Sequence, residues 1–229
     1  MLAGDGCAVN KKGQYSISLQ VTNKTFAEKF GEIGSNLFGI VFKWYVSNRS
    51  NKNKNWNAMY ICRFNSKKVV EYLGDWKEEV WTTTLKEKFH WVIENKSYII
   101  KFLEGFFDSE GTVRYNERIG TYQIVFAVQD INAHLFVQRL LENINLNPKS
   151  YRLRGKVKSI GLIGKLECQK FANKIRSVIE KKEKNLIKFR NLKIITKKII
   201  CKRCSHSWIP IQYQLRVKYC PKCRTSKWD

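Results

Sequence analysis

The stretch SYIIKFLEGFFDSEGTV, Ser97 to Val113, decides how the rest of the chain is interpreted. Its apolar and small residues recur around almost the whole circumference of a helix, as is typical of a helix that packs on all sides. Gly105 and Ser109 lie four residues apart, and small residues at this spacing allow two helix backbones to approach closely. Glu110 then ends the pattern before Gly111. The sequence therefore predicts a buried helix that ends in an acid.

An acid at this place is unfavourable, because the macrodipole of a helix favours cations at its C-terminus. Asp108 and Glu110 both fall in the last turn, which indicates a function for at least one of them. If an equivalent helix pairs with this one, two carboxylates come close together and repel each other unless a cation lies between them. Carboxylate oxygens are ligands that suit Mg²⁺, so the pair predicts a magnesium site. The alternative is that the acids merely mark a helix end before a glycine turn.

The chain contains a second copy of this pattern. Asp5-Gly6 precedes Glu110-Gly111 by 105 residues, and similar segments follow each pair, YSISLQV from Tyr15 and YQIVFAV from Tyr122. Apolar residues alternate with polar ones in both, which predicts two half-buried strands. Each strand meets a polar break and continues into a pattern of helical period.

Farther along, residues 59–73 and 159–175 each predict a strand that runs into a helix, so that the order of elements repeats. We expect an α+β protein built from two pseudo-symmetric repeats, residues 1–95 and 96–192, followed by a linker and a small appended unit in residues 193–229.

The charge of the chain indicates a polyanionic partner. The 229 residues carry 43 Lys or Arg against 19 Asp or Glu, a formal net charge of +24, and 43% of the residues are hydrophobic, enough for a core. Basic side chains that neutralise phosphates release counterions, so nucleic acid is the expected partner. No segment reaches the roughly 18 uncharged apolar residues of a membrane span, and no signal-peptide pattern opens the chain. We therefore expect a soluble, intracellular, cytoplasmic protein without a membrane partner.

Residues Leu103 to Gly111, LEGFFDSEG, resemble the nine-residue signature of LAGLIDADG homing endonucleases, and the resemblance extends over about residues 1 to 190, including the duplication. It implies a monomer whose two α/β repeats form a saddle over double-stranded DNA. It also implies Mg²⁺-dependent cleavage of both strands at a long asymmetric target. The metal-binding carboxylates of the family correspond to Glu110 and, if the Asp-Gly pairs align, to Asp5.

The resemblance assigns further residues. Alternate positions on one face of a β-ribbon can meet base edges in the major groove, and solvation of that outer face is the alternative. Near the carboxylates, Asn23 and Asp130 occupy the places of polar residues that order water, and Lys182 or Lys184 that of a lysine that completes the site. The expected DNA-binding residues are Gln14, Ser16, Ser18 and Gln20 in the first repeat and Arg118 and Gln123 in the second.

The tail carries a second motif. Two Cys-x-x-Cys pairs, Cys201 with Cys204 and Cys220 with Cys223, are separated by fifteen residues. This spacing is typical of tetrahedral four-cysteine Zn²⁺ sites, whereas a redox pair is the competing interpretation. The segment resembles zinc ribbons appended to archaeal DNA-associated proteins, which implies an archaeal host and additional contact with DNA; a protein partner for the ribbon is the alternative.

Two functions compete at this point. The first is the endonuclease; the second is a nucleic-acid binder that kept the fold without cleavage, such as an intron RNA maturase or a DNA-binding regulator. They differ in whether both carboxylates are held in place. The opening MLAGDGC can be aligned with the second motif in two ways. Either Asp5-Gly6 matches Glu110-Gly111, or Leu2-Ala3-Gly4 is the head of the motif and residues are missing before Asp5. In both alignments the first helix is shortened by about one turn or more.

Overall fold

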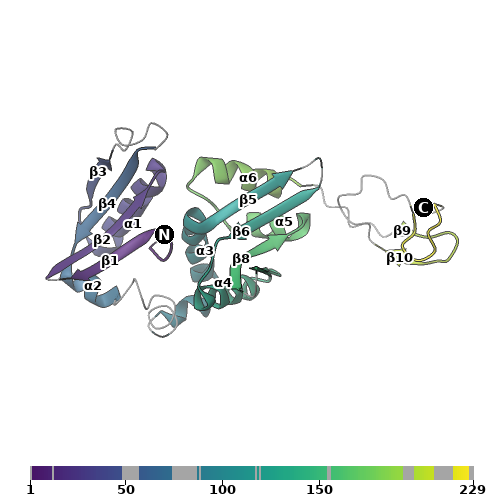
Figure 1. The fold of residues 1–229 in the computed structure, drawn as a ribbon, viewed down its shortest axis with the longest axis horizontal. Coiled ribbons are helices and arrows are strands. Elements are labelled where there is room, and N and C mark those ends of the chain that lie inside the picture. Colours follow the sequence, from purple (N-terminus) through teal and green to yellow (C-terminus); the bar gives the residue numbers. More distant parts are fainter. Residues whose placement is uncertain are drawn as a thin grey trace.

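A computed structural model describes residues 2–11, 13–47, 57–73, 87, 89–116, 118, 120–153, 156–192, 199–208 and 219–226. These residues form two four-stranded antiparallel sheets with helices and a small C-terminal unit, arranged in chain order along the long axis of the molecule (Figure 1).

The first sheet comprises four strands in the order β1-β2-β4-β3. A helix follows each inner strand, α1 (Lys24–Phe38) after β2 and α2 (Lys67–Leu73) after β4. The strands are β1 (Gly6–Lys11), β2 (Gln14–Val21), β3 (Lys43–Ser47) and β4 (Met59–Asn65).

The second sheet repeats this plan in the order β5-β6-β8-β7, with α4 (Ile131–Asn143) after β6 and α5 (Lys165–Lys174) after β8. A 3₁₀ turn, η2 (His90–Ile93), and helix α3 (Lys96–Glu110) precede it, and α6 (Glu180–Arg190) follows it. Its strands are β5 (Gly111–Asn116), β6 (Thr121–Phe126), β7 (Lys149–Leu153) and β8 (Lys156–Ile163).

The matching strand orders confirm the predicted α+β repeat. Each predicted strand-to-helix unit is present, as β2 to α1, β6 to α4, β4 to α2 and β8 to α5. The sequence patterns missed all four outer strands, β1 and β3 of the first sheet and β5 and β7 of the second. Strands β1 and β5 begin at Gly6 and Gly111 and pair with β2 and β6. Three of these edge strands show little alternation of apolar and polar residues. Strand β5 is the exception, since Val113 and Tyr115 are half-buried between exposed neighbours, so its pattern was present in the sequence.

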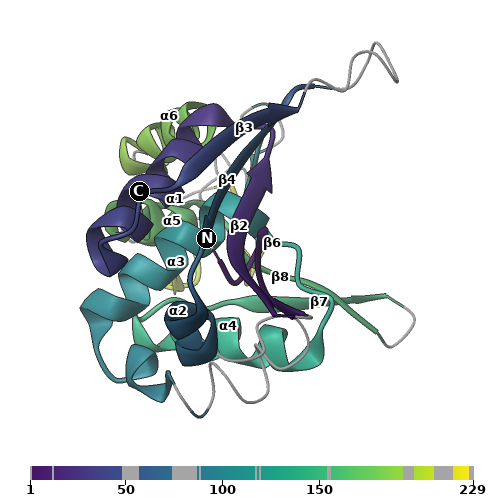
Figure 2. The same cartoon turned by 90° about the vertical axis from the view of Figure 1, so that its left-hand side faces the viewer.

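Helices cover one face of each sheet and leave the other face to the solvent (Figure 2). Along β2, Ile17 and Leu19 are buried, and along β6 the same alternation buries Ile124 and Phe126. Because side chains of a strand alternate between the two faces, the polar residues between them lie on the face without helices. The two uncovered faces are therefore available for contact with a partner.

Helix α3 is buried mainly over its second half. Asn95 caps its N-terminus by accepting a hydrogen bond from the Ser97 amide, and Leu103 and Phe107 are fully buried. The Phe107 ring packs against Phe171 of α5 at 5.3 Å between centroids. The predicted helix is confirmed, but packing on all sides is not: Tyr98 is 48% exposed and Lys101 is also exposed, so the first half of α3 keeps one side in solvent.

The equivalent segment of the first repeat differs from α3. Residues 2–5 form a turn that leads directly into β1, so the expected shortened helix is a turn in the structure. At the other end of the chain, β9 (Ile199–Ile200) and β10 (Ser207–Trp208) form a two-stranded ribbon. Among the residues described, no helix combines the length and the apolar composition needed to cross a bilayer.

Burial in α3 makes a direct prediction about stability. Leu103→Ala should lower the free energy of unfolding by about 2 to 5 kcal/mol, because the substitution leaves a cavity at a side chain that is fully buried. Leu135→Ala on α4 is the matched control, since Leu135 is 56% exposed and should change the value by less than about 1 kcal/mol. Urea unfolding followed by fluorescence measures both; equal effects would contradict the packing described.

Candidate functional site

The C-terminal end of α3 meets the N-terminal turn of the chain. Gly4 lies so close to α3 that a Cβ atom on it would be 2.1 Å from the Ser109 Oγ and 3.3 Å from the Glu110 Oε1. Only glycine can occupy such a position without displacing its neighbour. Asp5 follows Gly4, and this contact between the repeats therefore places the Asp5 and Glu110 carboxylates in one site.

The electrostatics agree with this proximity. Burial raises the pKa of the Glu110 carboxyl, the neighbouring Asp5 raises it further, and Lys182 lowers it. Burial also raises the pKa of Asp5, against the opposing effect of Lys182. Two carboxyl groups whose charges are both disfavoured form a site that attracts a cation.

Lys182, from α6, supplies one positive charge. Its ammonium group donates to the carbonyl oxygens of Phe107 at 2.8 Å and Asp108 at 2.7 Å. Asp108, Asp5 and Glu110 all raise its pKa, although burial lowers the pKa by a larger amount. Lys182 thus caps the negative end of the α3 dipole and lies beside the acids.

Lys184, the other lysine that the resemblance suggested, lies elsewhere. It is exposed and pairs with Glu180 on the same helix, with 2.5 Å between Nζ and Oε1. Of the two candidates, the structure brings only Lys182 to the carboxylates.

Asp108 belongs to the same cluster, although the sequence did not single it out as a site residue. Its side chain is 4% exposed and accepts hydrogen bonds from the Ser177 hydroxyl and, at 3.2 Å, from the Val178 amide. Burial raises its pKa, and these two hydrogen bonds and Lys182 lower it. Asp108 therefore holds the segment before α6, and with it Lys182, against the end of α3. Its position beside Glu110 in the last turn of α3 was the feature of the sequence that could have indicated this role.

Asn23 and Asp130 hold equivalent positions in the two repeats. Asn23 Oδ1 accepts from the Phe26 amide at 2.8 Å, and Asp130 Oδ1 accepts from the Ala133 amide at the same distance. Each residue is thus the N-cap of the helix that follows the inner strand, a role that the sequence reasoning missed although both types are common N-caps. Ala127 donates to the Glu110 carbonyl at 3.2 Å, so the segment that leads to Asp130 lies beside the end of α3.

A cavity of about 320 Å³ opens next to the carboxylates. Its lining includes Asp5, Asp108 and Ser109 from the junction, Gln20 from the end of β2, and Asn23. The structure therefore brings the first-repeat residue Asn23 to the same hollow as Asp5.

The expected DNA-binding residues lie on the uncovered faces of the sheets, except Arg118, which lies in the turn between β5 and β6. Gln14, Gln20 and Arg118 are exposed, and Ser18 and Gln123 are half-buried. Ser16 is only 4% exposed, so the expectation that it is accessible is wrong. The reason is its size and place: Ser16 is a small residue on an inner strand, with Val9 and Asn65 as its neighbours on the flanking strands.

The sequence reasoning missed basic and aromatic residues on β3 and β4. Lys43 and Arg63 are exposed and directly opposite each other across the two strands, and Tyr45 is 49% exposed on the same face. With Gln14 and Asn65 they line a hollow of about 800 Å³ at the end of the first sheet. Little in the sequence indicated these residues, because apolar and polar residues do not alternate regularly in β3 or β4.

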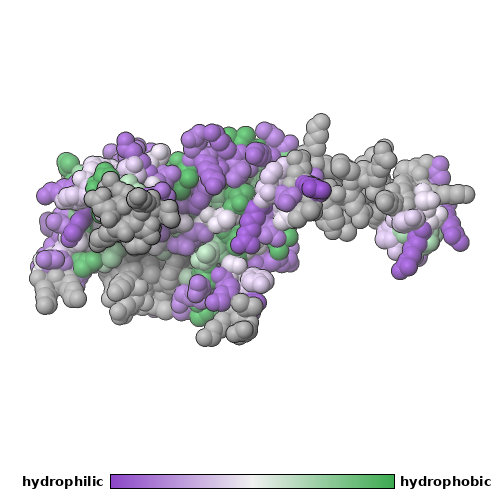
Figure 3. All heavy atoms as spheres, turned by 45° about the horizontal axis from the view of Figure 1, so that its top comes forward, coloured by the Kyte–Doolittle hydropathy of each residue, from purple (hydrophilic) through white to green (hydrophobic). Residues whose placement is uncertain are grey.

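The charge of the sheets is one-sided. The eight strands of the two sheets contain eight Lys or Arg and no Asp or Glu. Hydrophilic side chains cover much of the described surface in the view of Figure 3, with smaller hydrophobic areas between them. Such a surface favours a polyanion.

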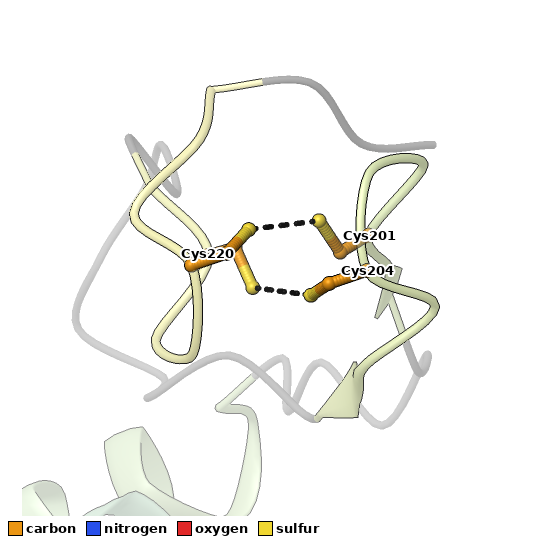
Figure 4. A group of neighbouring side chains, drawn as sticks. Cys201, Cys204 and Cys220 are labelled. Atoms are coloured by element: carbon orange, nitrogen blue, oxygen red, sulfur yellow. Dashed lines mark hydrogen bonds between the residues drawn. The ribbon is translucent and has the colours of Figure 1, made fainter.

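The four tail cysteines converge at a separate site (Figure 4). The sulfur atoms of Cys201, Cys204, Cys220 and Cys223 lie within 4.8 Å of one another, at 3.5 Å for Cys201 and Cys223 and 3.8 Å for Cys204 and Cys220. Thiolates around one tetrahedral Zn²⁺ lie ~3.8 Å apart, given Zn–S bonds of about 2.3 Å.

The two turns that carry these cysteines have the same geometry. The Ser205 amide donates to the Cys201 carbonyl at 2.8 Å, and the Arg224 amide donates to the Cys220 carbonyl at 2.9 Å. Ser205 and Arg224 have positive φ angles of 54° and 55°. Two matched turns facing each other form a closed four-sulfur site, so the donor set fits a structural zinc ion.

Comparison with known proteins agrees with the geometry at the junction. Residues 97–176 match the family model of the LAGLIDADG-like domain. This segment contains nearly all of α3, with Glu110, and the whole second sheet. The resemblance inferred from LEGFFDSEG at residues 103–111 is therefore confirmed for the second repeat at the level of this domain. The chain is also 32% identical over 124 residues to the uncharacterized protein MJ0314 of Methanocaldococcus jannaschii. The match covers 53% of this chain and 42% of that relative.

A solved structure shares this fold. The homing endonuclease I-WcaI bound to its DNA recognition sequence superimposes with a TM-score of 0.51 and 16% identity, over 76% of each chain. I-DmoI in complex with DNA and Mn gives a TM-score of 0.49 and 14% identity, over 76% of this chain and 90% of that chain. The two four-stranded sheets with their helices thus form the two-repeat LAGLIDADG α/β fold.

The raised pKa of Glu110 predicts how stability depends on pH. The folded state holds the Glu110 proton more tightly than the unfolded state does, so the contribution of this group to stability falls as pH rises from its ordinary value of 4.5 through the raised value. Glu110→Gln cannot ionise at this position, so the variant does not lose this stability as the pH rises. In EDTA, the variant should melt above the wild type at pH 7, and the difference should shrink toward pH 4.5 when melting is followed by differential scanning fluorimetry.

Glu142→Gln on the exposed side of α4 is the control for this measurement, and it should show no comparable trend with pH. A Glu110→Gln protein that melts at or below the wild-type temperature at pH 7 would contradict the proposed electrostatic strain at the junction.

Proposed function

We propose that the chain is a site-specific endonuclease that hydrolyses phosphodiester bonds in both strands of DNA with Mg²⁺. The observation that carries the proposal is the convergence of Asp5 and Glu110, one from each repeat, beside Lys182. The domain match and the fold support it, and so does the basic, acid-free pair of sheets, because a duplex lying along both uncovered faces would cross the junction where the carboxylates lie.

The residues of the junction fit a divalent cation. Asp5 and Glu110 offer hard oxygen ligands whose charges are disfavoured without a cation, which is the donor chemistry that Mg²⁺ prefers. When bound, Mg²⁺ would lower the pKa of a water molecule and polarise a phosphoryl oxygen. We assign Asp5 and Glu110 to holding it.

The remaining junction residues supply charge and position. Lys182 places a positive charge, fixed by two carbonyl oxygens, where negative charge develops on a scissile phosphate. Asn23 and Asp130 are held rigidly as helix N-caps, and each keeps a second polar atom with which we assign it to ordering water near the carboxylates. Gln14, Ser18, Gln20, Arg118 and Gln123, with Lys43, Tyr45 and Arg63, are proposed to contact DNA.

Cleavage of the native locus tests this function. A supercoiled plasmid that carries the genomic sequence flanking the gene, joined without the gene, should be linearised by the purified protein in Mg²⁺. Glu110→Gln should stop linearisation while retaining affinity for the same duplex in a gel-shift assay, because it removes a ligand and a negative charge but no DNA contact. Binding without any cleavage by the wild type would overturn the endonuclease proposal and favour the non-cleaving binder.

Two lysines on one helix give a matched pair for the same assay. Lys182→Met should slow cleavage by about 100-fold or more, as is common when one charge-stabilising group is lost. Lys184→Met should leave the rate within about twofold, because Lys184 faces away from the junction and pairs with Glu180. Equal effects of the two substitutions would contradict the assignment of Lys182.

We infer that the four tail cysteines bind one structural Zn²⁺. The inter-sulfur distances and the paired turns support this inference, and the segment from Lys181 to Arg203, with ten Lys or Arg against one acid, would add phosphate contacts between the fold and the ribbon.

Zinc content tests the tail directly. The purified wild type should contain about one zinc per chain by plasma mass spectrometry, and Cys220→Ser should lose most of it, because three thiolates leave the tetrahedral site open. Cys168→Ser is the control, since Cys168 is buried in α5 and donates to the Leu162 carbonyl far along the chain from the cluster. Full zinc content in Cys220→Ser would overturn the four-thiolate site.

A further inference from the structure

One arginine near the end of α6 holds three acceptors at once. The Arg190 guanidinium donates through Nε to the Ala172 carbonyl at 2.7 Å and through Nη2 to the Ile175 carbonyl at 3.1 Å, both at the C-terminal end of α5. Its Nη1 donates to Glu183 Oε1 at 2.7 Å. The side chains of Arg190 and Glu183 are only 15% and 24% exposed, so little solvent competes for this ion pair.

The other oxygen of Glu183 reaches back along the chain. Glu183 Oε2 accepts from the Ser177 amide at 2.8 Å, in the segment before α6 begins at Glu180. Ile179 occupies the N-cap position of α6 and makes no side-chain cap bond, so Glu183 fixes the entry into the helix in its place. The Ser177 hydroxyl donates to Asp108 Oδ1 at the end of α3. The amide and the hydroxyl of one serine therefore join Glu183 to Asp108.

The position of Lys182 depends on these bonds. Lys182 directly precedes Glu183 in α6. Its ammonium group donates to the Phe107 and Asp108 carbonyls. A lysine side chain has many rotamers, so its tip stays at one place only if the backbone that carries it is fixed. The bonds through Ser177 attach the first turn of α6 to the end of α3, and they therefore fix the backbone at Lys182.

Another contact already joins α5 to α6. The Gln169 side chain of α5 donates to the Arg190 and Leu192 carbonyls at 2.9 and 2.8 Å. A mostly buried ion pair contributes little net stability, because the cost of taking both charges out of water offsets their attraction. The contacts of Glu183 thus differ from that of Gln169 in where they act, since they hold the end of α6 that carries Lys182.

We propose that Glu183, with Arg190 as its counter-ion, is the positioning residue for Lys182. It fixes the first turn of α6 against the end of α3 and so keeps the ammonium group beside Asp5 and Glu110. The inference rests on the proposed nuclease function for the role of Lys182 in cleavage. The position of the ammonium group can be measured without cleavage, so either proposal can fail without the other.

The accessibility of Lys182 tests the proposal. In the full chain, N-hydroxysuccinimidyl acetate can acetylate Lys182 only in molecules in which its amine has left the two carbonyl oxygens. Glu183→Gln should raise the acetylation rate of Lys182 by about tenfold, because an amide has a single acceptor oxygen and one of the two contacts is lost. Peptide mass spectrometry measures the rate, and Lys184, whose side chain is 69% exposed, is the internal reference.

Ser177→Ala breaks the next link and serves as a second variant if Glu183→Gln does not fold. It should raise the Lys182 rate comparably, and the double variant should exceed the larger single effect by less than about twofold, because links in series are not additive. An unchanged Lys182 rate in either folded single variant would overturn the proposal. So would a double variant whose rise is the product of the two single rises.

Gln169→Leu is the matched control. It loosens the contact between α5 and α6 at the other end of α6, and should leave the acetylation rate of Lys182 within about twofold of the wild type, because it is not a link to that lysine. A rise equal to that of Glu183→Gln would overturn the proposal, since the packing of the two helices as a whole would then hold Lys182.

Cleavage separates positioning from general stability. Glu183→Gln should lower the single-turnover cleavage rate by about tenfold without weakening DNA binding in a gel-shift assay, because a misplaced charge-stabilising group slows the reaction. It should have no further effect in a Lys182→Met protein, and a further loss there would overturn the proposal. A wild type that never cuts would overturn the nuclease function, and acetylation of Lys182 then decides the positioning role by itself.

Discussion

The structure depends on one close approach between two segments that are far apart in the sequence. Gly4 contacts Ser109 with no room for a Cβ atom, and this contact sets the distance between the acids that follow, Asp5 and Glu110. The backbone of Gly4 lies directly against the Cβ and Oγ atoms of Ser109, a short side chain that has little freedom to move aside. A small-residue junction thus fixes the relation of the repeats, and the electrostatic problem at the site follows from it.

That problem is resolved locally by one lysine. Acids in the last turn of α3 oppose the helix dipole, and Lys182 offsets this by donating to the carbonyl oxygens of Phe107 and Asp108. Asp108, fixed by Ser177 and Val178, keeps α6 in place so that this ammonium group stays beside the carboxylates. The same contacts therefore stabilise the helix end and arrange the charge of the site.

Much of this was predictable from the sequence where a periodic pattern or a spacing determines the structure. The repeat, the buried helix at 96–110 and the cysteine cluster depend on such local rules. The edge strands β1, β3 and β7, the burial of Ser16 and the choice of Lys182 over Lys184 were not predictable, because they depend on which segments become neighbours in the folded chain. Asp108 was visible as an acid, but its partners lie about 70 residues away.

The pairing of Lys43 with Arg63 across β3 and β4 has a thermodynamic meaning of its own. Like charges opposite each other weaken a sheet, and no acid in any of the eight strands offsets the repulsion. The side chains at both positions are exposed, so solvent screens part of this repulsion. A polyanion bound at this edge would supply the counter-charge that the strands lack, and the proposed DNA binding would then also stabilise the first sheet.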